Sequence, residues 1–140
     1  MDTDITTLIG ATTATVVLRG VGGTTTTVTA TMAELDPSEQ GLSIGTRFIP
    51  WHRIVSYGWP LRQSTEVGDG HHRVTVRFVV DEGTATRIYE VPADRFELGP
   101  WTMTALLEDR VEPEEGLRVF RRVSFPWEAV QEYERIVAAD

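Results

Sequence analysis

The sequence predicts an α+β fold that is mainly antiparallel β, a strongly bent sheet or a small barrel, with two short helices. Three observations indicate this class. Apolar and polar residues alternate along several segments, clusters of Gly, Pro and Asp separate these segments, and two later segments carry apolar residues at helical spacing. We expect a short helix near 100–111 and a C-terminal helix near 126–138. The length of 140 residues suits a single domain, 1–140.

The first third of the chain is rich in threonine and predicts a hairpin. Val28, Ala30 and Met32 alternate with threonine, and the run 14–18 alternates in the same way. The glycine-rich segment 20–23 separates the two runs and supplies the turn. A low-complexity, mobile tract is the alternative interpretation of this composition.

Two further strands are predicted at 42–49 and 53–59, after the turn-forming segment 36–39. Pro50 lies between them. Because proline donates no main-chain hydrogen bond, we expect Pro50 at an edge, a bend or a bulge. The polar segment 62–70 is the best internal boundary, so two half-units joined near 62–70 are an alternative to one undivided domain.

The rest of the chain predicts a hairpin, two helices and one strand. Apolar residues alternate along 74–80, and a return strand at 87–91 follows a turn of Asp, Glu and Gly. Proline opens each predicted helix, and a strand at 117–123 lies between the helices. The apolar residues at helical spacing are Met103, Leu106, Leu107 and Val111 in the first helix, and Trp127, Val130, Tyr133 and Val137 in the second.

One short internal similarity links the two parts of the chain. Segments 48–54 and 124–130 share an aromatic residue, a Pro-Trp pair and an apolar residue three positions after the tryptophan. Both segments end predicted strands. A match this short arises readily by chance, and a duplicated half-domain is the alternative interpretation.

Composition restricts the class of partner and the compartment. The formal net charge is −8, and all 13 basic residues are arginine, which is typical of a GC-rich, for example bacterial, genome. A negative balance repels polyphosphates, so nucleic acid is an unlikely partner, and we expect no membrane partner either. Acidic residues at the N-terminus do not match a secretory signal, and no apolar run is long enough to span a bilayer. We therefore expect a cytoplasmic protein.

The sequence offers no catalytic motif. Cysteine is absent, which excludes disulfides and thiolate metal sites, and no nucleophile elbow or phosphate-binding loop is present. His52, His71 and His72 are the only histidines and are weak candidates for a zinc site. Adjacent strand residues point to opposite faces, so His71 and His72 could share a metal only within a loop. We expect no cofactor and consider an enzyme the less favoured possibility.

The segment that looks most like a binding surface is Trp51, His52 and Arg53, with Tyr57 and Trp59 downstream. Aromatic residues next to arginine are typical of recognition surfaces, because they offer rigid area with a polar group. Alternatively, Trp51 and Trp59 are core residues on either side of a bend.

Three resemblances follow from these residues. The segment Ile-Pro-Trp-His-Arg-Ile at 49–54 resembles the Ile-Pro-x-His-Arg-Ile/Val hairpin of a small RNA-end-recognition domain found beside RNA ligases and phosphodiesterases. The strand ending in Phe-Ile-Pro-Trp resembles the edge strands of Sm-like and other SH3-like barrels. About seven strands with a terminal helix resemble a pleckstrin-homology-like fold, in which the helix at 100–111 would be an insertion.

The function that these observations favour is a non-enzymatic binding or assembly module that acts through protein–protein contacts. Open sheet edges must be covered or paired, and self-association is a common solution, so we expect a homo-oligomer. Recognition of an RNA end or a nucleotide through His52 and Arg53 is the alternative. A metal-dependent hydrolase built on the histidines is a second alternative.

Overall fold

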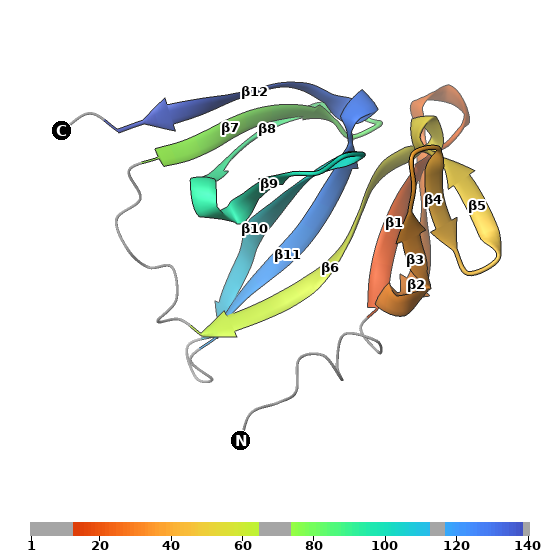
Figure 1. Ribbon diagram of the computed structural model, residues 1–140, viewed down its shortest axis with the longest axis horizontal. Coiled ribbons are helices and arrows are strands. Elements are labelled where there is room, and N and C mark those ends of the chain that lie inside the picture. The colour runs from red at the N-terminus through yellow and green to blue at the C-terminus, as the bar shows by residue number, and fades with distance from the viewer. Residues whose placement is uncertain (1–12, 65–73, 113–116, 139–140) are drawn as a thin grey trace.

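The computed structural model describes residues 13–64, 74–112 and 117–138, and most of these residues lie in strands (Figure 1). The first group of strands is β1 (Thr13–Arg19), β2 (Thr25–Thr31), β3 (Leu35–Pro37), β4 (Gly41–Ile44), β5 (Arg47–Pro50) and β6 (Ile54–Ser64). The second group is β7 (Val74–Asp81), β8 (Thr86–Pro92), β9 (Phe96–Leu98), β10 (Thr102–Glu112), β11 (Leu117–Pro126) and β12 (Val130–Val137). Short 3₁₀ turns connect several of them: η1 (Val21–Gly23), η2 (Met32–Glu34), η3 (Trp51–Arg53), η4 (Ala93–Arg95) and η6 (Trp127–Ala129).

The two predicted helices are wrong, and with them the α+β class. Strand β10 occupies most of 100–111, while η6 and β12 occupy 127–137. In β10 the side chains of Met103, Ala105 and Leu107 are buried, which is the period of a strand. The helical spacing arose because Leu106, on the opposite face, is also apolar. In β12 most side chains are exposed, so its sequence lacks the clear alternation of a strand with one buried face.

The hairpins and the antiparallel class are confirmed. β1 pairs with β2 and β7 pairs with β8, each antiparallel, as the alternating patterns predict. Pro50 ends β5, an edge strand, and stands directly before the bend at η3. Among the described residues no helix has the length and hydropathy needed to cross a membrane.

The strands form three antiparallel sheets, and the described residues form no closed barrel. A six-stranded sheet has the order β2-β1-β6-β11-β10-β9, and two three-stranded sheets have the orders β12-β7-β8 and β3-β4-β5. β2 and β3 are separated only by η2, and β8 and β9 only by η4, so each pair is one bent strand that passes from one sheet to the next. Followed through these bends, the strands form one continuous antiparallel series whose two ends are β5 and β12.

The two groups of strands have the same topology. We call β1–β6 unit 1 and β7–β12 unit 2. In unit 1 the pairs are β1-β2, β1-β6, β3-β4 and β4-β5; in unit 2 they are β7-β8, β7-β12, β9-β10 and β10-β11. Even the irregularities coincide, because β1-β6 and β7-β12 each have a register shift just after the start of the last strand. The two Pro-Trp segments, at η3 and η6, hold equivalent places in the two units.

The units differ in the length of one hairpin. In unit 1 the turn of Gly45 and Thr46 joins β4 to β5, and Gly45 has a φ of 61°, a conformation that glycine adopts without strain. In unit 2 Ala105 opposite Val123 is the equivalent of Ile44 opposite Arg47, the pair that flanks this turn, and the chain between Ala105 and Val123 extends β10 and β11. The extension gives β11 the length to pair with the long strand β6.

Each unit has its own hydrophobic cluster. Buried residues of unit 1, including Val16, Leu42 and Ile54, form one cluster. In unit 2 the ring of Phe78 lies at the centre of the other, with centroids 5.4 Å from Tyr89, 5.8 Å from Phe96 and 5.9 Å from Phe125. The units meet along β6 and β11, and a second contact joins Arg19 to Asp81 at 3.4 Å.

Candidate functional site

Two aromatic residues of the predicted binding surface are core residues. Trp51 is 7% exposed and Tyr57 is 5% exposed, and their rings stack with centroids 6.2 Å apart. The Trp51 indole N–H donates to the carbonyl oxygen of Ser38 at 2.8 Å. This bond ties the bend at η3 to the loop before β4, so the tryptophan holds unit 1 together.

The same arrangement recurs in unit 2. The Trp127 indole N–H donates to the Gly99 carbonyl oxygen at 3.0 Å, and its ring lies 6.2 Å from that of Tyr133. Ser38 and Gly99 hold equivalent places, since each backbone N–H closes the turn before β4 or β10. The Pro-Trp similarity therefore marks a repeated structural device.

The remaining residues of that surface are separated from one another. His52 and Arg53 are exposed on η3, whereas Trp59 is half-buried on β6 beneath the Arg122 guanidinium, 4.6 Å from the ring centroid. His71 and His72 lie outside the described residues. Within the described ranges no three His, Cys, Asp or Glu side chains gather as metal ligands.

The junction between the units is a ladder of eight residue pairs between β6 and β11, from Leu117 opposite Ser64 to Ser124 opposite Tyr57. This ladder requires glycine at position 58. A Cβ at this position would lie 1.9 Å from the carbonyl oxygen of Arg122, so no other residue permits this approach of the two main chains.

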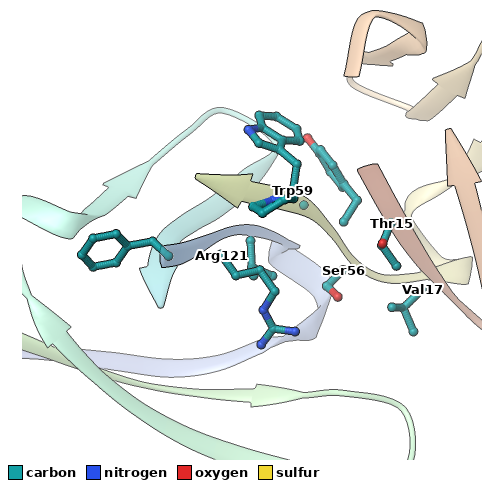
Figure 2. A pocket seen from close by; sticks show the side chains of 10 residues that line it. Thr15, Val17, Ser56, Trp59 and Arg121 are labelled. Carbon is teal, nitrogen blue, oxygen red and sulfur yellow. The ribbon is translucent and has the colours of Figure 1, made fainter. Parts of the chain in front are cut away.

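A pocket of about 130 Å³ opens beside this junction, lined by β1, β6 and β11 (Figure 2). Figure 2 shows Arg121 and Trp59 pointing away from each other, with Ser56 on the side of Arg121. Gly58 lies among the residues that line this space. The lining is mostly apolar with one exposed guanidinium, which suits a small contact better than an enclosed ligand.

Buried polar groups lie beside the junction, and one of them links the two units. The Thr104 and Ser124 hydroxyl oxygens lie 2.7 Å apart and share a hydrogen bond. Burial raises the pKa of the Tyr57 hydroxyl, while a hydrogen bond with Ser124, the positive charge of Arg122 and a hydrogen bond with Thr102 oppose the shift. Tyr57 belongs to unit 1 and its three partners to unit 2, so the tyrosine links the two.

Unit 2 has a second titratable group in its own hairpin. The Tyr89 hydroxyl donates to a Glu82 carboxylate oxygen, and Arg87 lies 3.6 Å from the same carboxylate. Burial, this hydrogen bond and the negative charge of Glu82 raise the pKa of Tyr89 to about 12.

A pH dependence of stability follows from Tyr89. Its pKa in the folded protein lies above the unfolded value of about 10, so folding favours the neutral hydroxyl. This contribution to the free energy of unfolding is complete below about pH 10 and is lost as the pH rises towards 12. Urea unfolding at a series of alkaline pH values is expected to show a shallower loss in Tyr89→Phe than in the wild type. An equal dependence of the free energy of unfolding on pH in both proteins would contradict the raised pKa of Tyr89.

The two outermost strands expose aromatic side chains that the sequence analysis did not predict to be exposed. Phe48 on β5 is 48% exposed, and Tyr133 on β12 is 42% exposed. β5 lies at the outer side of unit 1 and β12 at the outer side of unit 2 (Figure 1). Tyr133 was expected in the apolar stripe of a buried helix. An exposed aromatic residue on an edge strand is a signal that only the strand assignment reveals.

Comparison with protein family models, with curated proteins and with solved structures gives no match to this chain.

Proposed function

We propose that this protein is a non-enzymatic assembly module that self-associates through its sheet edges. The observation that carries the proposal is that both ends of the strand series, β5 and β12, pair on one side only among the described strands, and each exposes an aromatic residue. Unpaired main-chain donors and acceptors on an edge strand are a template for another strand. Exposed aromatic side chains beside them add apolar area that association would remove from water.

Charge supports a specific contact rather than general aggregation. The formal net charge of −8 keeps copies apart at long range, so only a contact with local complementarity overcomes it. The edges carry such charges: Arg47 on β5, and Glu132 and Glu134 on β12. We place this assembly in the cytoplasm, and we propose that the strand ending in Phe-Ile-Pro-Trp, 48–51, is similar to the edge strands of Sm-like and other SH3-like barrels.

The test is the oligomeric state of the purified chain. Sedimentation velocity and light scattering over a range of concentrations are expected to show a mass that rises above that of the 15.6 kDa chain. A monomer at the highest concentration would contradict the proposal.

Recognition of an RNA end is less well supported. It would have to use His52 and Arg53 without Trp51 or Tyr57, because those two rings are buried and cannot stack on a base. The acidic balance of the chain also opposes binding of a phosphate backbone.

A further inference from the structure

The junction inside the chain shows how two units of this kind join. There, β6 of unit 1 pairs with β11 of unit 2. In the shared topology, β12 is the equivalent of β6, and β5 is the equivalent of the last part of β11. Each of the two strands that form the internal junction therefore has an equivalent, and in the described ranges both equivalents have one edge with no partner.

We propose that β5 of one copy pairs antiparallel with β12 of a second copy, so that copies join head to tail and repeat the internal junction. This inference rests on the proposed function and names its contact. The two edges differ, so the contact is heterologous. It closes into a ring if the rotation between copies permits and otherwise continues as a filament.

The internal register predicts which residues would face each other. At the junction Val123 is opposite Gly58, and Ser124 is opposite Tyr57. Their equivalents are Arg47 opposite Glu134 and Phe48 opposite Tyr133. The first pair carries opposite charges and the second pair is aromatic, and both kinds of pair stabilise neighbouring strands.

The contrast between Tyr57 and Tyr133 supports this pairing. Each tyrosine lies 6.2 Å from the tryptophan of its own Pro-Trp turn, so the two hold the same place. Yet Tyr57, covered by β11, is 5% exposed, whereas Tyr133 is 42% exposed. Tyr133 thus occupies a position that its equivalent shows to be buried once a strand is added.

A cavity beside Tyr133 can receive the Phe48 ring. It has a volume of about 220 Å³ and is lined by Val76, Ala93, Phe96, Leu98, Tyr133 and Arg135. At the internal junction the equivalent of Phe48, Ser124, lies against Tyr57. Phe48 in the same place would reach this cavity, whose lining is apolar apart from one guanidinium, a group that also packs on aromatic faces.

Two differences weaken the contact between copies. Glu134 is the equivalent of Gly58, whose lack of a side chain allows the close approach of β6 and β11 at the internal junction. The Glu134 carboxylate lies 3.2 Å from the Arg77 guanidinium. β5 is also shorter than β11. We therefore expect the contact between copies to be looser than the internal junction and to depend on concentration.

The test uses charge reversal on the full chain. Arg47→Glu would leave like charges facing each other across the contact, and so would Glu134→Arg. Each variant alone is expected to lower the association constant at least about tenfold, which corresponds to about 1.4 kcal/mol. An equimolar mixture is expected to restore association, because the carboxylate introduced on β5 of one variant then faces the guanidinium introduced on β12 of the other. The two variants change net charge in opposite directions, so a general charge effect cannot explain a loss in both.

Sedimentation velocity distinguishes the outcomes. The β5–β12 contact is refuted, while self-association stands, if the wild type associates and both variants associate as strongly as the wild type. The contact is also refuted if mixing the two variants does not restore association. If the wild type is a monomer, both proposals fail. Asp94→Arg, an equal charge change on the exposed turn η4, is the control and should associate like the wild type. Circular dichroism checks the fold; if a reversal unfolds the chain, Phe48→Ser and Tyr133→Ser take its place with the same expected loss.

Discussion

Replacing Gly58 with valine is expected to lower the free energy of unfolding by about 3 kcal/mol, the upper part of the range for forcing extra atoms into a packed site. The added Cβ would lie 1.9 Å from the Arg122 carbonyl oxygen. Since main-chain atoms cannot move aside as a side-chain end can, β6 and β11 must separate. The change breaks the ladder that joins the two units, and we expect one unfolding transition to divide into two.

Urea unfolding followed by tryptophan fluorescence and by circular dichroism measures this effect. The matched control is Glu134→Val, which places the same valine side chain at the equivalent, exposed position on β12. At a dilution where the chain is monomeric, the control should keep wild-type stability within about 0.5 kcal/mol, the usual range for surface changes. Equal stability of both variants would mean that Gly58 does not hold the junction.

Phe78→Ala is expected to cost about 3–5 kcal/mol, the range for removing a buried phenylalanine ring. Phe78 is fully buried, and three aromatic rings surround it within 6 Å between centroids. No neighbouring strand can close the cavity without losing its own pairing. The loss should appear first in unit 2, as faster amide hydrogen exchange in β7, β8 and β10 than in β1 and β2.

Ile88→Ala is the control for this second variant. Ile88 lies on the neighbouring strand β8 and is 63% exposed, so its removal leaves no cavity. Its free energy of unfolding should stay within about 0.5 kcal/mol of the wild type. A comparable loss in both variants would show that the aromatic cluster is not the centre of unit 2.

The sequence was informative where one face of a strand is buried and the other is exposed. Threonine alternates with apolar residues along β2, and Val76, Phe78 and Val80 alternate along β7, so both hairpins were predictable. Period-two patterning failed where both faces of a strand are covered. In β10 the apolar Leu106 lies between Ala105 and Leu107, and the mixture imitates helical spacing.

The candidate site was less accessible to such reasoning. The Pro-Trp similarity was visible, but only the pairing of the strands shows that it marks equivalent bends in two units. Trp51 and Trp127 attracted attention as recognition or stripe residues, although both donate to a loop of their own unit. Phe48 and Tyr133 are candidate contact residues because their strands lie at the ends of the series. This position depends on long-range strand pairing and cannot be predicted from the local sequence pattern.

In the proposed assembly, the unequal hairpins would give the contact between copies a shorter lifetime than the junction within one chain. The extended β10 and β11 make the link within one chain a long ladder, whereas the turn of Gly45 and Thr46 cuts β5 short. Dilution alone would then separate the copies, whereas only heat or denaturant would separate unit 1 from unit 2 within one chain. Chains released in this way would remain folded and could enter a new assembly, so subunits would exchange freely.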